Sequence, residues 1–186
     1  MMIQFYLMEA WEAVLSVRAF EDYTVRDIRV PEYSEEDGIM CLGRCEENLC
    51  GNYGTNWGCP PDVDIDPEEL YMSSSDVLLV SRTFCLDVKD RDVLEATGLE
   101  MQKIVRMMVM ELRSNNIDCL GFADGGCRYC GVCAYPEPCR FPEMLVPSIS
   151  SLGLDMKSYL NGQGIPFAFS DTCVTLYGLI FLRKAD

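Results

Sequence analysis

The sequence predicts an α/β or α+β fold, with one domain over residues 1–186 and a small mixed sheet flanked by helices. Segments of strand length and segments with helical periodicity are interspersed along the chain. No internal repeat and no low-complexity linker divides it. Hydrophobic residues make up 49% of the chain and charged residues 24%, which excludes a globally disordered protein.

The N-terminal part is expected to hold a helix and a strand. Residues 6–19 place apolar side chains on one side of a helix, and residues 24–30 alternate apolar and polar side chains as a half-buried strand does. Residues 32–38 are rich in acidic side chains and are expected to form a solvent-exposed turn.

The middle of the chain holds the clearest helix and strand signals. Asp66 is a capping residue followed by proline and two acidic residues, which predicts a short helix to about residue 75. Residues 77–84 begin with an unbroken apolar run, which is typical of a central strand. Asp90 begins the longest predicted helix, which extends to about Asn115, and a short strand is expected at residues 119–122.

The C-terminal part is expected to hold short helices and a last strand. A helix begins at Pro147 and passes Leu152, and a further helix or turn covers residues 156–161. Glycine and proline then interrupt the chain before the strand at residues 174–182.

Charge and hydropathy narrow the range of partners. The chain has 30 acidic and 15 basic residues, a formal net charge of −15, so neither nucleic acid nor an anionic membrane surface is expected as a partner. No apolar run approaches the roughly 18 residues of a membrane-spanning helix, so membrane insertion is not expected. The N-terminal residues do not resemble a secretion signal, and the expected location is the cytoplasm.

Cysteine is abundant and histidine is absent. The chain has 11 cysteines and no histidine, which excludes Ser-His-Asp and Cys-His catalysis as well as zinc sites that use histidine. Eight cysteines fall in two groups, one in a predicted loop over residues 41–61 and one in a predicted loop over residues 125–142. Both loops are expected to lie at one edge of the sheet. The predicted metal ligands are Cys41, Cys45, Cys50 and Cys59 in the first group and Cys127, Cys130, Cys133 and Cys139 in the second.

Three interpretations of these groups compete. A disulfide framework suits secreted chains, and the odd number of cysteines disfavours it. Zinc bound by four cysteines is a second interpretation, but the second group contains two overlapping C-x2-C pairs, one ligand too many for a single knuckle. An iron–sulfur cluster is favoured, because three thiolates at steps of three residues can follow a tight loop around one cube. The amide N–H groups of such a loop would stabilise the sulfides.

The first group is less regular than the second. Cys59 precedes Pro60, as the remote closing ligand of a ferredoxin cluster does, in a segment rich in glycine and asparagine. Eight cysteines indicate two [4Fe–4S] clusters, and Cys59 and Cys139 could each serve the cluster of the other group. A surface loop with incidental thiols is the alternative for the first group. The three isolated cysteines are expected to be small buried apolar residues, with a spare ligand or a reactive thiol as the alternative: Cys85, Cys119 and Cys173.

Two motifs carry a resemblance to a known family. Residues 50–61 resemble the C-x2-Y-G-x2-W-x-C-P-P signature of an uncharacterised prokaryotic family of predicted metal-binding proteins. Residues 126–142 resemble its second signature, which contains C-x2-C-x2-C-x5-C-R-x-P, and residues 147–155 a third. The resemblance spans nearly the whole chain. It implies metal binding by the cysteine motifs and occurrence in anaerobic bacteria and archaea, and it implies no particular reaction.

The chain departs from the family pattern at two places. Ile149-Ser150-Ser151 stands where the family carries Met-Glu-Ala, so any role of that glutamate is absent. Cys45 is additional to the family pattern. The fourth ligand of the first group is therefore either Cys45 or a cysteine from elsewhere.

The favoured function is an iron–sulfur protein that transfers electrons or acts as a redox accessory protein, with a protein partner whose docking face is basic. One alternative is an iron–sulfur enzyme with an open iron, and another is an interaction module stabilised by zinc. Arg128 and Arg140 are expected to offset cluster charge or to hold an anionic substrate. Tyr53 and Trp57 are expected to pack over a cluster and exclude water.

Overall fold

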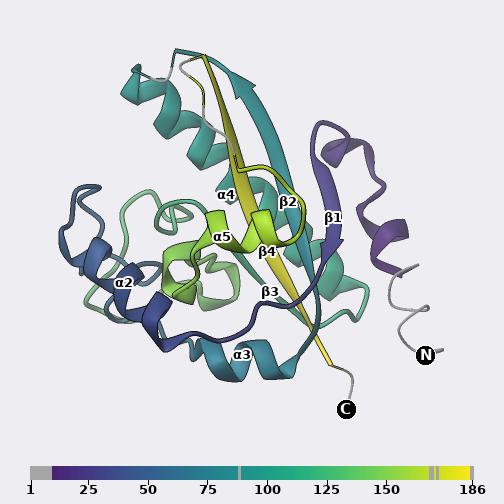
Figure 1. Cartoon of the computed structure of the whole chain (residues 1–186), viewed down its shortest axis with the longest axis horizontal. Coiled ribbons are helices and arrows are strands. Elements are labelled where there is room, and N and C mark those ends of the chain that lie inside the picture. The colour runs from purple at the N-terminus through teal and green to yellow at the C-terminus, as the bar shows by residue number, and fades with distance from the viewer. Residues whose placement is uncertain (1–9, 88, 168–169, 171, 185–186) are drawn as a thin grey trace.

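The computed structural model describes residues 10–87, 89–167, 170 and 172–184, and it confirms the predicted α+β class. One sheet has the strand order β1-β2-β4-β3 (Figure 1). Its strands are β1 (Thr24–Ile28), β2 (Ser74–Cys85), β3 (Cys119–Ala123) and β4 (Cys173–Arg183).

The expectation of a mixed sheet is corrected. Each pair of neighbouring strands in the described part of the chain is antiparallel. The helix between β2 and β3 joins two strands that run in the same direction but lie on opposite sides of β4. Two strands joined by a helix can pair in parallel, and the sequence alone allowed this pairing. In the structure β4 lies between the two strands, so every pairing is antiparallel. The only parallel contact among described residues is an isolated bridge between Ala123 and Ser148.

The helices and 3-10 turns agree with most of the predicted ranges. Residues 10–15 are helical, and the first four residues of the predicted helix 6–19 lie outside the described residues. The remaining elements are η1 (Arg18–Phe20), α2 (Glu35–Glu46), α3 (Pro67–Ser73), α4 (Arg91–Ser114), η2 (Pro142–Met144), η3 (Ile149–Leu152) and α5 (Met156–Gly162).

The predicted helix caps are present. The Asp66 carboxylate accepts hydrogen bonds from the N–H groups of the second and third residues of α3, and Asp90 does the same for α4. These bonds satisfy donors that the first turn of a helix leaves without partners. Both helices therefore begin where the sequence predicts.

The expectation of an exposed turn at residues 32–38 is wrong, because α2 begins within this range. Ser34 caps this helix by accepting from the N–H of Asp37, and three acidic side chains occupy the first turn. Negative charge at a helix N-terminus is stabilising, so the same acidic run that suggested a turn supports a helix. The segment from Cys41 to Glu46, expected as loop, is the C-terminal half of α2.

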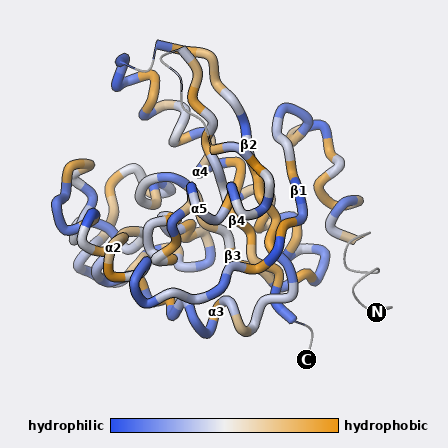
Figure 2. Tube along the Cα trace, in the orientation of Figure 1, coloured by the Kyte–Doolittle hydropathy of each residue, from blue (hydrophilic) through white to orange (hydrophobic). Residues whose placement is uncertain are grey.

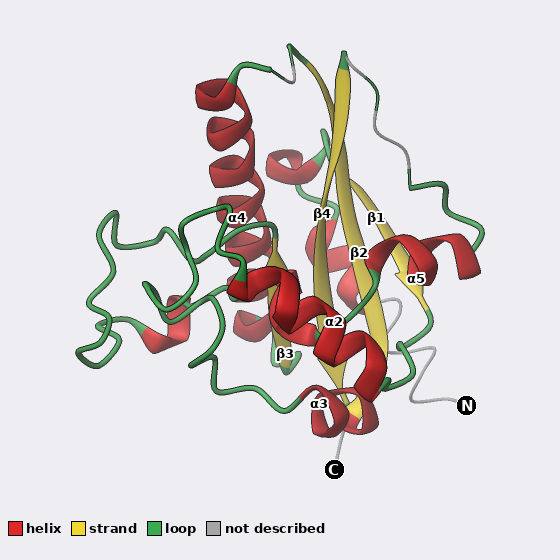
Figure 3. Cartoon of the chain, turned by 60° about the vertical axis from the view of Figure 1, so that its left-hand side comes forward, coloured by secondary structure: helices red, strands yellow, loops and turns green. Residues whose placement is uncertain are grey.

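The two faces of the sheet bury separate apolar cores. Leu78 and Val80 point to a core that α4 covers, and Val77 and Leu79 point to a core under α3, η3 and α5. This alternation explains why the central strand is an unbroken apolar run. Figure 3 shows the sheet between α4 and α5, and Figure 2 shows hydrophobic segments of the strands in the middle of the molecule. In the described part of the chain, no helix combines the length and the apolar character that crossing a membrane requires.

Candidate metal centre

The two cysteine-rich segments meet beside β3, which is one of the two edge strands of the sheet. The second segment follows β3 directly, and the first begins in the C-terminal half of α2 (Figure 1). The Ser148 N–H donates a 2.7 Å hydrogen bond to the Gly58 carbonyl, which ties the first segment to the chain that follows the second. The predicted meeting of both segments at one sheet edge is therefore observed.

The closest approach of the two segments occurs at two glycines. A Cβ atom at Gly58 would lie 2.6 Å from the backbone nitrogen of Cys127. A Cβ atom at Gly126 would lie 2.9 Å from the sulfur of Cys59. Both distances are shorter than real Cβ contacts, so only glycine permits this approach. Cys59 is thereby held against the residue that precedes Cys127.

Asn56 fixes the geometry of this contact. Its side-chain oxygen accepts a 2.9 Å hydrogen bond from the Gly58 N–H, and its side chain hydrogen-bonds the Cys59 thiol. Asn56 is 7% exposed, so its polar atoms depend on these partners. No local pattern pointed to Asn56 separately, beyond its place inside the motif.

Helix α4 anchors the second segment through two polar side chains. The amide of Gln102 donates to the carbonyl oxygens of Asp124 and Gly125, at 3.2 and 3.1 Å. Arg106 donates to the Met144 carbonyl at 2.7 Å and to the sulfur of Cys127 at 3.7 Å. Its guanidinium also lies 5.1 Å from the centre of the Tyr129 ring.

Gln102 and Arg106 were not among the predicted site residues. The available signal was their spacing: two polar residues four positions apart on a helix face that is otherwise rich in buried apolar residues. Such a pair indicates a polar partner across the interface. It does not say which partner, because the carbonyls and the thiol come from a distant segment.

The predicted aromatic residues have different roles. The indole N–H of Trp57 donates to the Glu137 carbonyl at 2.8 Å, and its ring meets the edge of Tyr135 at a centroid distance of 5.1 Å. Trp57 thus holds the first segment onto the second. Tyr53 stays within its own segment, where its N–H donates to Asn48.

The two predicted arginines are engaged by protein groups. Arg128 forms a 2.5 Å ion pair with Glu95 on α4. Arg140 donates to the Val132 carbonyl within the second segment. Both contacts position the second segment.

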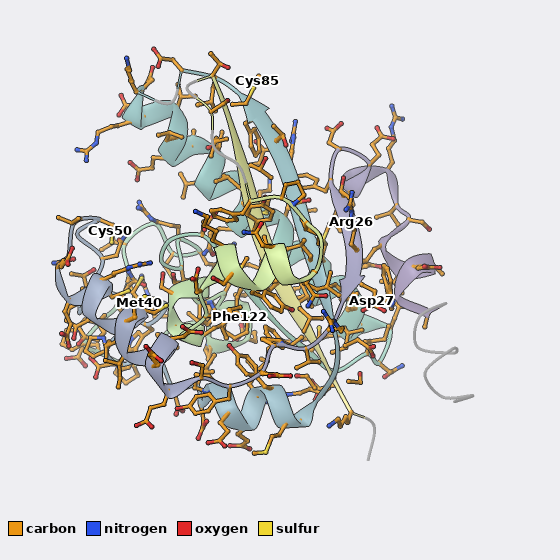
Figure 4. All side chains as sticks on the ribbon, viewed as in Figure 1. Arg26, Asp27, Met40, Cys50, Cys85 and Phe122 are labelled. Atoms are coloured by element: carbon orange, nitrogen blue, oxygen red, sulfur yellow. The ribbon has the colours of Figure 1, made fainter. Side chains whose placement is uncertain are left out.

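The first group of cysteines extends from α2 to the contact with the second segment. Cys41 and Cys45 lie one turn apart on α2, and the Cys45 thiol hydrogen-bonds Ser150. Cys50, which is labelled in Figure 4, is exposed, and Cys59 is buried. Burial raises the pKa of Cys59 to about 11, although the hydrogen bond from Asn56 opposes this shift. Metal binding by Cys59 would therefore release a proton.

The structure brings the segments together without gathering the eight thiols. Within the residues described, no set of three or more cysteine or acidic side chains is placed closely enough to hold a metal ion. The donor chemistry still fits a thiolate-bound centre, because the chain offers many sulfur donors and no imidazole, a set that suits zinc or iron–sulfur clusters. The cradle at Gly126, which any side chain would fill, places the Cys59 sulfur beside the residue that precedes Cys127.

A cleft of about 520 Å³ adjoins this contact. It lies between the first segment, α4 and the second segment, and Cys50, Glu95, Asp124 and Arg128 line part of it. Burial raises the pKa of Asp124 to about 6, while a hydrogen bond from the Tyr177 backbone lowers it. The cleft therefore combines a thiol with charged groups of both signs.

The isolated cysteines differ in exposure. Cys119 is fully buried, as expected. The same expectation is wrong for Cys85, which is exposed, and Cys173 is only partly buried. Both lie where β2 and β4 extend past the other strands, so no core covers them.

A comparison with protein families matches most of the chain. Residues 39–182 match the family described as "Predicted metal-binding protein (DUF2284)". The match begins inside α2 and ends near the end of β4, so it includes both groups of cysteines. No curated protein and no solved structure matches the chain.

Proposed function

Because the chain belongs to the DUF2284 family of predicted metal-binding proteins, we propose that its cysteine groups bind one or two [4Fe–4S] clusters and that it transfers electrons or acts as a redox accessory protein. A bound cluster would supply one-electron redox chemistry. The observation that carries the proposal is the contact of Cys59 with Gly126, which brings the two thiol-rich segments to one place.

Cys59 is the proposed ligand that links the groups. It lies beside the start of the C-x2-C-x2-C motif, so it would complete a set with Cys127, Cys130 and Cys133. This assignment follows the ferredoxin pattern in which a Cys-Pro ligand serves the more distant motif. The other four cysteines would then hold a second cluster: Cys41, Cys45, Cys50 and Cys139.

Several side chains support this role. Arg106 places positive charge beside Cys127, and hydrogen bonds and charge near a cluster sulfur tune its reduction potential. Trp57 and Tyr135 cover the junction between the segments. Water exclusion by such groups protects a cluster from hydrolysis and oxidation.

We further propose a redox partner with a basic docking face. The net charge of −15 favours rapid, salt-sensitive association with such a protein. Two apolar side chains project from the cysteine-rich segments, Leu49 with 85% exposure and Val132 with 80%. Exposed apolar side chains of this kind suit a small transient interface.

A redox titration under strictly anaerobic conditions tests the proposal. We expect a reversible one-electron change in visible absorbance and in the EPR spectrum. Cys59→Ser should lose iron, whereas Cys85→Ser, which removes an exposed thiol far from both groups, should not. Equal iron in the two variants would contradict the role of Cys59, and a protein without any redox-active chromophore would contradict electron transfer.

A second candidate, an iron–sulfur enzyme with an open iron, is favoured by the cleft beside exposed Cys50. An iron that lacks a fourth thiolate acts as a Lewis acid toward a bound substrate. Cyanide is a suitable probe, since it coordinates an open iron. A changed EPR spectrum on its addition would favour the enzyme, and an unchanged spectrum would favour the carrier.

A further inference from the structure

Two cysteines outside both groups face each other across the long strands. Cys85 ends β2, Cys173 begins β4, and the strand register places them directly opposite one another. The Cys173 side chain lies within hydrogen-bonding reach of the Cys85 thiol. Figure 4 shows Cys85 at the tip of this ribbon, far from Cys50 in the first group.

The hydrogen bonds around the pair show which kind of antiparallel position it occupies. The next pair toward the strand ends is bonded, since the Leu86 N–H donates to the Thr172 carbonyl at 3.0 Å. The backbone groups of Cys173 turn away from β2 instead, and both bond to Ser170. Because bonded and non-bonded pairs alternate along an antiparallel ladder, Cys85 and Cys173 form a non-hydrogen-bonded pair.

A non-hydrogen-bonded position brings opposite side chains close together. Opposite Cα atoms of a non-hydrogen-bonded pair lie about 4.5 Å apart, within the range that a disulfide spans. The neighbouring pair on the same face demonstrates the close approach, because the hydroxyl oxygens of Thr83 and Thr175 lie 2.8 Å apart. Cys85 and Cys173 therefore occupy a strand position whose usual Cα separation a disulfide can span.

We propose that Cys85 and Cys173 are a reversible dithiol–disulfide pair, oxidised by a low-molecular-weight disulfide. The exposed Cys85 thiolate attacks one sulfur of the oxidant, which forms a mixed disulfide and releases one thiolate. The Cys173 thiolate then attacks the Cys85 sulfur and releases the second. The protein loses two protons and two electrons, and the oxidant is reduced to two thiols.

The bond would close a large loop of the chain. It would join the end of β2 to the start of β4 and enclose α4, β3 and the whole second cysteine group. A cross-link that closes a long loop restricts the unfolded chain and raises stability. The stability of the region that carries the second cysteine group would therefore depend on whether Cys85 and Cys173 are oxidised or reduced.

Peptide mapping of the full-length chain tests the pair. The chain is purified anaerobically, treated with glutathione disulfide, blocked with an alkylating reagent and digested with trypsin without reduction. Cleavage after Lys and Arg gives peptides 83–89 and 158–183, which contain Cys85 and Cys173 as their only cysteines. We expect these two peptides to be linked, and dithiothreitol to separate them.

A displaced thiol provides the matched control. The variant Cys85→Ser with Thr83→Cys keeps an exposed thiol on the same strand face but opposite Thr175, diagonal to Cys173. The diagonal distance of about 7 Å is too long for a disulfide. This variant should therefore keep glutathione as a mixed disulfide while Cys173 is alkylated.

The thermal midpoint gives an independent readout. Oxidation should raise the Tm of the natural chain by about 5 °C or more, and it should leave the Tm of Cys173→Ser unchanged. Persistent glutathione on Cys85 in the natural chain, or linkage of Cys85 to any peptide other than 158–183, would overturn the proposal. Neither outcome bears on the iron–sulfur proposal, because these two cysteines are not among its ligands.

Discussion

A guanidinium N–H of Arg106 on α4 points at the sulfur of Cys127, at 3.7 Å. Arg106 is also held by the Met144 carbonyl, so the contact does not depend on a freely moving side chain. The longest helix of the fold thus delivers a positive charge to the first cysteine of the second group. This arrangement connects the packing of α4 on the sheet to the electrostatics of the proposed centre.

Removal of this charge should lower the reduction potential. Arg106→Gln loses the cation beside Cys127, so a reduced cluster, which carries one more negative charge, is less stabilised. A net interaction of about 1 kcal/mol corresponds to about 40 mV for one electron. Arg106→Lys, which retains the charge, is the matched control. Redox titration by EPR should give a smaller shift for the lysine variant, and equal potentials in all three proteins would contradict this role.

A methyl group at Gly126 should separate the two cysteine-rich segments. Gly126→Ala places a Cβ atom 2.5 Å from Asn56 and 2.9 Å from Cys59 Sγ, so one segment must move. We expect a loss of about 1–3 kcal/mol in unfolding free energy and a lower metal content.

Gly98→Ala is the control for this substitution, because the added Cβ on α4 meets nothing within 4 Å. Alanine in a helix should stabilise the protein by about 0.5–1 kcal/mol. Urea unfolding and metal analysis measure both effects. Unchanged metal content in Gly126→Ala would show that the approach of the segments is not needed for binding.

Asp124 should make stability depend on pH. Its pKa is raised from 3.8 to about 6, so the folded state favours the protonated form. The raised pKa of Asp124 therefore adds to the unfolding free energy at low pH. This added stability is fully present below about pH 4 and is lost as the pH rises through about 6, and it amounts to about 3 kcal/mol.

Asp124→Asn, which stays neutral, removes this contribution. The unfolding free energy of the natural chain should therefore fall relative to that of the variant between pH 4.5 and 7.5. Denaturant unfolding across this range measures the difference. Two parallel pH profiles would mean that Asp124 is not buried as described.

Trp57 should keep the junction between the segments closed. Trp57→Phe loses the hydrogen bond to the Glu137 carbonyl and should cost about 1 kcal/mol of stability. Tyr53→Phe, which loses only a 3.4 Å hydroxyl hydrogen bond to Glu46 within the first segment and keeps the backbone bond of Tyr53, is the control. We expect faster bleaching of visible absorbance in air for the tryptophan variant alone. Equal bleaching rates in both variants would contradict a role of Trp57 in protecting the cluster from air.

Local signals in the sequence predicted most elements but not their pairing. Capping by Asp66 and Asp90 acts within one turn, so the starts of α3 and α4 were predictable. The start of α2 was missed because acidic residues suit both an exposed turn and a helix N-terminus. Strand direction was not predictable, since periodicity within a strand does not specify its neighbour.

The site, like the fold, has features that local patterns predicted and features that depend on contacts between distant residues. Cysteine spacing identified both segments, and the strand before the second segment indicated a common sheet edge. The anchoring by Gln102 and Arg106 depends on contacts between α4 and distant residues, which no local pattern encodes. The exposure of Cys85 was missed for a related reason: the apolar run before it suggested burial, but β2 continues beyond the core.

The central claim is that these thiols bind iron–sulfur clusters, and metal analysis of an anaerobic preparation tests it most directly. Iron, acid-labile sulfide and zinc should be determined per chain on protein that is shown to be folded. The account predicts a brown protein with at least about four iron and four sulfide per chain, the content of one cluster. A folded, colourless protein that contains zinc, or no metal, would contradict it.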